Sequence, residues 1–153
     1  MDKPIDWRGS SLDDLREFPE VARRVAGYEL RKLQRGEPPD DWRPFPEVGP
    51  GVNEIRIDAP DGWFRVMYVA KFEEAIYVLH SFQKSTRKTS RDDVEVAKTR
   101  YRAVVAERKS WSELQAAVRL DAVKLLLVAK ALSLDALFRP VAHFHCGVLR
   151  RAD

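Results

Sequence analysis

Cysteine and histidine are scarce in this chain of 153 residues, and several common catalytic motifs are missing. A single cysteine, Cys146, excludes an intramolecular disulfide and fits a reducing cytoplasm. The chain has no glycine-rich phosphate loop, no nucleophile elbow and no zinc-protease helix. Chemistry that depends on any of these three arrangements is therefore excluded.

Long uncharged hydrophobic runs are also missing. A membrane-spanning helix needs about 18 or more apolar residues in succession. The most hydrophobic region, residues 114–138, is interrupted by Arg119, Asp121, Lys124, Lys130 and Asp135. The N-terminus is charged with no apolar run behind it, so no signal peptide is evident. We therefore expect a cytoplasmic protein without a membrane segment.

A large excess of either charge is absent overall, but the charges are unevenly distributed. Hydrophobic residues at 44% and charged residues at 33% describe a soluble globular protein. Lysine and arginine number 12 against 16 acidic residues over residues 1–79, but 9 against 4 over residues 80–110. A local anion-binding surface and a solvated basic helix both explain this difference, and charge alone does not choose between them.

Hydrophobic periodicity predicts an α+β domain over residues 1–110. Alternating apolar residues indicate strands, and apolar residues three and four apart indicate helices. Because the strands follow one another through short connections, we expect N-terminal helices packed on a mainly antiparallel sheet. In chain order the pattern predicts a strand over 3–8, helices over 11–18 and 19–36, strands over 52–58, 63–71 and 75–82, and a helix over 91–109 capped by Ser90.

One long segment inside this domain breaks the pattern. Residues 36–53 hold five of the nine prolines and three of the seven glycines, so we expect an ordered loop with no regular element. Trp42 and Phe45 in this loop either anchor it to the core or stack on bases.

Residues 111–153 form a C-terminal helical extension in this interpretation. Ser112 and Gln115 provide a capping box for an apolar helix that reaches about residue 132, and a short helix follows near 134–139. Three roles stay open for the apolar helix: it covers the sheet, it mimics a helix of a partner protein, or it forms the interface of a homodimer.

A charged residue stands inside an otherwise apolar strand. Arg65 lies within residues 63–71, and the loop that follows the next strand carries Lys84, Arg87 and Lys88. Cations fixed on or beside a rigid sheet suit a ligand with charged phosphates. An unpaired guanidinium in an apolar strand is costly, which favours phosphate binding by Arg65.

Arg65 also has a structural interpretation. A salt bridge to Glu54 or Glu74 across the sheet would pair its charge within the protein. The residues alone leave both interpretations open.

Residues 63–89 resemble the toxins of the RelE/HigB superfamily of type II toxin–antitoxin systems, particularly their phage-derived branch. The run R-V-M-Y-V from Arg65 and the run V-L-H-S-F-Q-K ending at Lys84 match the family patterns "R-V-x-Y-V" and "V-L-H-x-F-x-K-K-T". Ser85 replaces the second lysine of that pattern, and Arg87 compensates for the missing cation. The resemblance covers about residues 3–109.

The resemblance implies a RelE-like fold and an endoribonuclease, an mRNA interferase that cleaves messenger RNA on the ribosome. It also implies a cognate helix-turn-helix antitoxin as partner, and no metal or other cofactor. The alternative is a decayed toxin that binds antitoxin or RNA without cutting.

Cleavage by internal transesterification needs removal of the 2′-hydroxyl proton, stabilisation of the phosphorane and protonation of the 5′-oxygen. Because residues 3–109 hold one histidine, a two-histidine mechanism is excluded. The resemblance implies that basic residues and a tyrosine replace the usual acid and base. The catalytic candidates are Arg65, Lys84, Tyr68 and His80, and the candidates for binding RNA phosphates are Arg56, Arg87 and Lys88.

Each of these candidates also has a plainer interpretation. Tyr68 fits a core position, and His80 fits a hydrogen-bonded structural position. Arg87 and Lys88 also fit a solvated loop.

A histidine–cysteine cluster near the C-terminus is the one metal-like motif. His143, His145 and Cys146 lie close together in sequence, but no fourth ligand is nearby. We expect no metal site.

Overall fold

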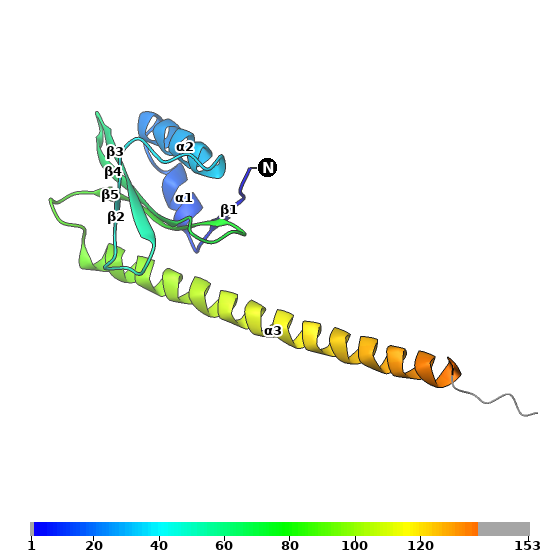
Figure 1. Ribbon diagram of the computed structural model, residues 1–153. Helices are drawn as coiled ribbons and strands as arrows, with labels where there is room; N and C mark the ends of the chain where they lie inside the picture. Colours follow the sequence, from blue (N-terminus) through cyan, green and yellow to red (C-terminus); the bar gives the residue numbers. More distant parts are fainter. Residues whose placement is uncertain (1, 138–153) are drawn as a thin grey trace, which may run out of the picture. The chain divides into compact units, whose positions relative to one another are not determined.

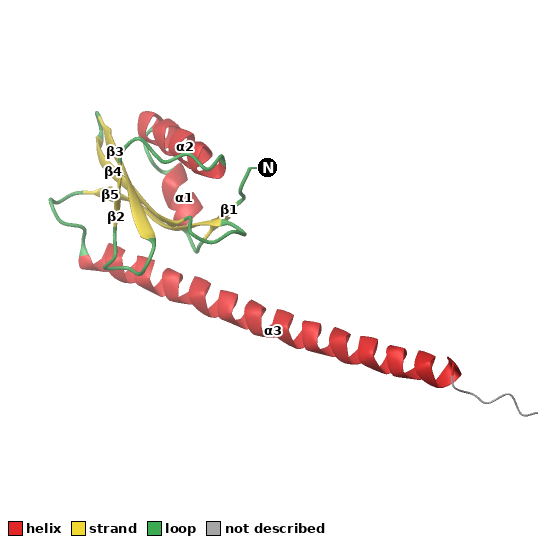
Figure 2. Ribbon diagram, in the orientation of Figure 1, coloured by secondary structure: helices red, strands yellow, loops and turns green. Residues whose placement is uncertain are grey.

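The computed structural model describes residues 2–137 and confirms the predicted α+β class, with a five-stranded sheet and helices on both of its faces (Figures 1 and 2). The sheet order is β1-β5-β4-β3-β2, and only the pairing of β1 with β5 is parallel. The elements are β1 (Ile5–Trp7), α1 (Ser11–Arg16), α2 (Glu20–Gln34), β2 (Trp42–Pro44), β3 (Val52–Ala59), β4 (Gly62–Val69), β5 (Ile76–Lys84) and α3 (Arg91–Leu137).

The chain divides into two units, Met1–Lys109 and Ser110–Asp153. All the strands and the first part of α3 belong to the first unit. The interpretation of residues 1–110 as a toxin domain and 111–153 as an extension with its own role stays a prediction.

One face of the sheet is covered by α1 and α2 (Figure 1). Apolar residues of α2 recur at helical spacing and turn toward Ile55, Ile57 and Val66 of the sheet. The rings of Phe18 and Phe64 lie 4.8 Å apart in this layer. The buried apolar residues of α2 are Ala22, Ala26, Leu30 and Leu33.

The opposite face is covered in part by the start of α3. Ser90 caps this helix as predicted, because its hydroxyl accepts a hydrogen bond from the backbone N–H of Asp93 at 3.1 Å. Tyr101 of α3 packs against the loop before β3 and donates its hydroxyl proton to the carbonyl of Pro50. At Gly49 a Cβ atom would lie 2.3 Å from the Tyr101 ring, so this close approach requires glycine.

The prediction of no regular element in residues 36–53 is wrong, because β2 pairs there with β3. Composition alone indicated a loop, since this segment holds five prolines. Proline is tolerated in β2 because β2 is an edge strand. At position 44 the backbone N–H would point away from β3, so Pro44 removes no hydrogen bond of the sheet.

The prediction of a separate helix beginning at Ser112 is also wrong, since α3 runs without a break from Arg91 to Leu137. No glycine or proline occurs between these two residues to stop the helix. Residues 134–137 of the predicted short helix belong to α3, and the rest of it lies outside the described residues.

Within residues 2–137, no helix combines the length and the uninterrupted apolar character that crossing a membrane requires.

Candidate functional site

The α3-facing side of the sheet carries a group of charged side chains on β2, β3, β4 and β5. The register places Arg43 opposite Glu54, Arg56 opposite Arg65, and Trp63 opposite Lys84. Directly opposed residues share a face of the sheet, and alternation along each strand joins these pairs on one side. We call this group, made of Arg43, Glu54, Arg56, Arg65 and Lys84, the basic face.

Glu54 lies at the centre of the basic face and is completely buried. One carboxylate oxygen accepts a hydrogen bond from the Nε of Arg43 at 2.7 Å, and the other lies 3.4 Å from the Nε of Arg65. Among the described residues, neither that second oxygen nor the Nε of Arg65 has a hydrogen-bond partner. The buried carboxylate therefore offsets the charges of two arginines, but one of the two contacts is loose.

Arg65 is anchored in the sheet, with an exposed fraction of 7%. Its Nη1 donates to the carbonyl of Phe64 at 2.7 Å and lies 3.3 Å from a carboxylate oxygen of Asp58. The ion pair with Glu54 that was the alternative interpretation is present, whereas Glu74 instead pairs with Arg108. Arg65 therefore has several partners within the protein, and it contributes a fixed positive charge beneath the surface.

Lys84 differs from Arg65 because its ammonium group has no ion pair or hydrogen bond among residues 2–137. Partial burial lowers the pKa of Lys84, and the nearby charges of Arg65, Arg43 and Arg56 lower it further. Glu54 opposes this shift. A lysine with a lowered pKa is a better proton donor than an ordinary lysine and still carries a positive charge toward a ligand.

A second group of cations lines a hollow of about 520 Å³ between β2 and the loop that follows β5. We call it the exit-loop hollow. The predicted Arg87 and Lys88 both line it, and Arg43 connects it to the basic face. The hydroxyl of Thr89 is buried there without a partner in the described part of the chain. The complete lining is Arg43, Phe45, Glu47, Arg87, Lys88, Thr89 and Arg91.

Sequence reasoning missed Arg43 and Arg91 as members of this hollow. Arg43 occurs in a proline-rich segment, where no strand was expected to orient it. Arg91 follows the predicted loop residues closely, so the density of cations from residue 84 onward was the signal that could have included it.

Arg56 lies beside Arg65 in the register and is partly exposed. Its Nε and Nη2 both contact one carboxylate oxygen of Asp41, at 2.8 and 2.5 Å. Asp41 therefore competes with a phosphate for this guanidinium.

His80 lies on the same side of β5 as Lys84, four residues earlier. Its Nε2 contacts a carboxylate oxygen of Asp93 at 2.9 Å, and its ring stacks on Phe82 with centroids 5.0 Å apart. Its Nδ1 lacks a hydrogen-bond partner among the described residues and lies 3.9 Å from an oxygen of Asp14. His80 therefore joins β5 to α3, and its Nδ1 is buried.

Tyr68 lies on the opposite face of the sheet from the other catalytic candidates. It belongs to the core under α1 and α2, whereas Arg65 and Lys84 belong to the basic face. Burial raises the pKa of Tyr68 to about 12, opposed by a hydrogen bond with Asn53. The structure thus brings together Arg65, Lys84 and Arg56, with His80 farther along the same side of β5, and does not bring Tyr68 to them.

No group of histidine, cysteine, aspartate and glutamate side chains in residues 2–137 is arranged to hold a metal ion. The cluster of His143, His145 and Cys146 lies outside the described residues.

Comparison with known proteins shows the family of this chain. The model of the family described as "Phage derived protein Gp49-like" (DUF891) matches residues 13–102, which is more than half of the chain and includes the basic face and the exit-loop hollow. No curated protein matches it. With its α+β architecture, which agrees with a RelE-like fold, the chain belongs to the phage-derived Gp49-like family, a family of RelE-like toxins.

Proposed function

We propose that this protein is the toxin of a type II toxin–antitoxin system and that it cleaves messenger RNA as a metal-independent endoribonuclease. The observation that carries the proposal is the pairing of the basic face with the exit-loop hollow. The first offers an unpaired ammonium group near an anchored arginine, and the second offers cations for a neighbouring stretch of RNA backbone.

In the proposed reaction the 2′-oxygen of a ribose attacks the adjacent phosphorus, and the bond from phosphorus to the 5′-oxygen breaks. The products are a 2′,3′-cyclic phosphate and a 5′-hydroxyl end. A base accepts the 2′-hydroxyl proton, and an acid supplies a proton to the departing 5′-oxygen. Negative charge accumulates on the phosphorane between these two steps, so fixed cations lower the barrier.

Lys84 is the central residue of this mechanism. Its ammonium group stabilises the phosphorane and donates the proton to the 5′-oxygen, a role that its lowered pKa supports. Arg65 acts as a fixed charge near Lys84, because its guanidinium is already held by Glu54, Asp58 and backbone carbonyls.

The remaining predicted residues have supporting roles in the proposal. Arg87 and Lys88 hold backbone phosphates in the exit-loop hollow, together with Arg43 and Arg91. Arg56 contributes at the rim of the basic face once RNA competes with Asp41. His80 is the candidate base, because it lies on the same side of β5 as Lys84, and its buried Nδ1 has to become exposed before it accepts the 2′-hydroxyl proton.

The partner proteins follow from the proposed class of toxin. A cognate helix-turn-helix antitoxin would silence the enzyme, and the ribosome would present the message. Positioning alone supplies a large part of a rate enhancement, so a site with few acid–base groups gains from RNA that the ribosome already holds in place. Mapping the cleavage of translated and naked message tests this dependence, and equal cleavage of both would contradict it.

The main test is growth arrest and RNA cleavage after induction of Lys84→Met. We expect at least about a hundredfold loss of cleavage, as is typical when one group that stabilises transition-state charge is removed. Lys98→Met is the matched control, since Lys98 lies on α3 and pairs with Glu95 and not with a member of the basic face. Equal loss in both variants, or no loss in either, would overturn the assignment of Lys84.

A non-catalytic module that binds antitoxin or RNA is the second candidate. The observation in its favour is that Arg65 is occupied by partners within the protein. Such a module binds RNA through the exit-loop hollow but leaves the strand intact, so binding and cleavage must be measured on the same preparation.

A homodimer through the extension is a further proposal. Residues 110–132 of α3 carry large exposed apolar side chains. Sedimentation of the full chain and of a Leu125→Glu variant tests it, and an unchanged monomer in both would contradict it.

A further inference from the structure

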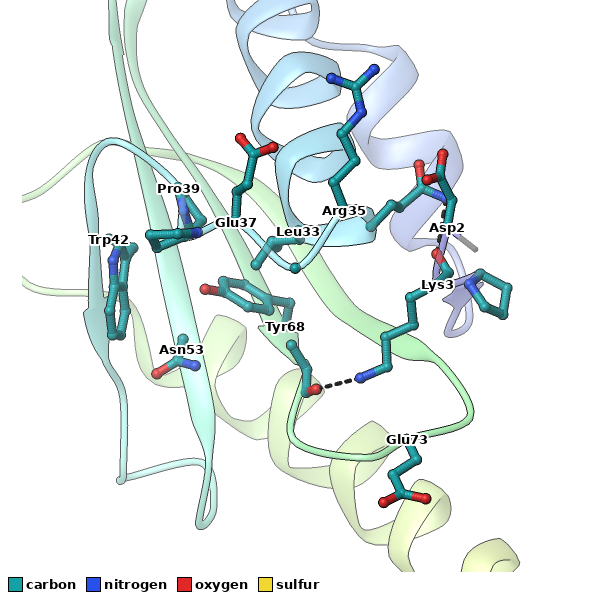
Figure 3. A pocket seen from close by; sticks show the side chains of 15 residues that line it. Asp2, Lys3, Leu33, Arg35, Glu37, Pro39, Trp42, Asn53, Tyr68 and Glu73 are labelled. Carbon is teal, nitrogen blue, oxygen red and sulfur yellow. Dashed lines mark hydrogen bonds between the residues drawn. The ribbon is translucent and has the colours of Figure 1, made fainter.

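A larger hollow, of about 730 Å³, lies on the face opposite the basic face (Figure 3). Its wall contains the end of α2, the loop that follows it and the first residues of the chain, and its floor contains side chains of β2, β3 and β4. Its volume lies within the range of small-ligand sites. We call it the aromatic hollow, after Trp42 and Tyr68.

Three side chains in the aromatic hollow suit a planar ligand with a hydrogen-bonding edge. Figure 3 shows Trp42, Asn53 and Tyr68 around one space, with Pro39 and Leu33 beside them. Trp42 is 41% exposed, so its ring is available for stacking. The amide of Asn53 both donates and accepts hydrogen bonds, and the buried hydroxyl of Tyr68 stays protonated at physiological pH.

The charges around the aromatic hollow do not select a phosphate. Cationic Lys3 and Arg35 line it together with three acidic residues. Lys3 is moreover occupied, since its ammonium group donates to the carbonyl of Ala70 at 2.7 Å. A neutral ring therefore fits this hollow better than a phosphate does. The acidic residues are Asp2, Glu37 and Glu73.

The edge strand β2 connects the two faces of the sheet. Trp42 and Arg43 are successive residues of β2, and successive side chains of a strand point to opposite faces. Arg43 belongs to the basic face and to the exit-loop hollow, whereas Trp42 lines the aromatic hollow. β2 is the outermost strand of the sheet. One strand is about 4.8 Å wide, so the path around β2 from one face to the other is short enough for a few nucleotides to span.

We propose that the aromatic hollow is a nucleobase subsite for single-stranded RNA. One base stacks on Trp42, and its edge forms hydrogen bonds with Asn53 and Tyr68, while a phosphate of the same strand contacts Arg43 across the sheet edge. The proposal rests on the proposed function, because the same strand occupies the basic face.

The test measures how tightly a short 2′-O-methyl oligonucleotide binds to Trp42→Ala. This RNA has no 2′-hydroxyl to attack, so binding is measured without cleavage. We expect about a tenfold loss of affinity, as is typical when one stacked base loses its aromatic partner. Trp42→Phe should restore most of the affinity, because phenylalanine also offers a stacking surface.

Tyr28→Ala is the matched control. Tyr28 is an aromatic residue on α2 with an exposed fraction of 62% and does not line the aromatic hollow. Tyr68→Phe is the second variant, because it removes the hydroxyl and leaves the packed ring in place. An affinity that Trp42→Ala and Tyr68→Phe both leave unchanged overturns the proposal and leaves the hollow to a ligand of another class, such as a peptide side chain.

The failure of this subsite and the failure of the proposed function give different results. If wild type binds the oligonucleotide and cleaves RNA but Trp42→Ala binds as tightly as Tyr28→Ala, the subsite alone is wrong. If Trp42→Ala weakens binding but wild type cleaves nothing, the subsite is supported and the endoribonuclease proposal fails. If wild type does not bind the oligonucleotide, the subsite proposal is overturned, and the endoribonuclease proposal is decided separately by the cleavage of translated message.

Discussion

The two faces of the sheet differ in what their side chains do, although both are built from the same strands. Phe64 and Val66 face α1 and α2 and are almost completely buried in apolar surroundings. Arg65, between them in the chain, faces the other way and is held by carboxylates and carbonyls. Phe64 and Val66 therefore contribute to stability, and Arg65 contributes charge, because alternation sends adjacent residues of β4 to opposite faces.

The largest effect should come from Phe64→Ala, which removes a ring from the face that α1 and α2 cover. Phe64 is 1% exposed and its ring contacts that of Phe18. We expect the free energy of unfolding to fall by about 3–5 kcal/mol, since the substitution loses buried area and leaves a cavity. Chemical denaturation of the full chain measures this change.

Trp63→Ala is the control on the same strand. Trp63 is half exposed and faces the opposite side, so its loss should cost roughly 1 kcal/mol or less. Equal losses for Phe64 and Trp63 would show that the two faces do not differ in stability as described.

A smaller loss of stability should follow Glu54→Gln, which removes charge from the basic face and keeps the shape of the side chain. Arg43 and Arg65 then lose their shared buried partner. Removing one partner of a buried ion pair typically costs about 3 kcal/mol, and Arg65 keeps Asp58 as a remaining partner. Denaturation measures the cost, and Glu47→Gln, at an exposed position in the exit-loop hollow, is the control.

Stability unchanged by Glu54→Gln would mean that this carboxylate does not organise the basic face. The same result would leave Asp58 and the backbone carbonyls as the groups that fix the charge of Arg65.

A third prediction concerns RNA binding rather than stability. Replacing both Arg87 and Lys88 with alanine should reduce affinity for single-stranded RNA and flatten its salt dependence. If each contacts one phosphate, the slope of log affinity against log salt should fall by about 1.4. The control replaces Arg23 and Arg24 of α2, outside the exit-loop hollow, and should leave the slope unchanged.

The sequence predicted those parts of the fold that depend on local pattern. The alternation of β3 and the cap at Ser90 involve only neighbouring residues. The strand β2 depends instead on pairing with β3 across the hairpin, which proline-rich composition concealed. Arg43 was missed for the same reason, since its role depends on Glu54, eleven residues away in the chain.

The placement of Tyr68 shows a different limit. Arg65 and Tyr68 are three residues apart, and an odd separation on a strand puts two side chains on opposite faces. The alternation rule therefore contained this information, but the family resemblance placed both residues in one set. Periodicity decides which residues can meet, and a motif does not.

The last and smallest effect is a shift in the pH profile of cleavage. The pKa of Lys84 lies below its ordinary value of 10.5, mainly because of burial. If the ammonium form is the acid, the rate should fall as pH rises through this lowered pKa, earlier than for an exposed lysine. Lys84→Arg should keep positive charge and remove this alkaline decline, since arginine does not lose its proton in this range.

The same shift has a consequence for stability, and its sign is opposite to that of a group stabilised by a partner. A lysine whose pKa is lowered on folding favours the unfolded state while it is charged in both states. The penalty is present below the folded pKa and is relieved as pH rises toward the unfolded pKa, because the unfolded chain then holds more protons. Lys84→Met should therefore stabilise the fold slightly at neutral pH, and this gain should shrink in alkaline solution. An equal gain in neutral and alkaline solution would show that the charge of Lys84 does not destabilise the fold. It would also remove the support for Lys84 as the proton donor.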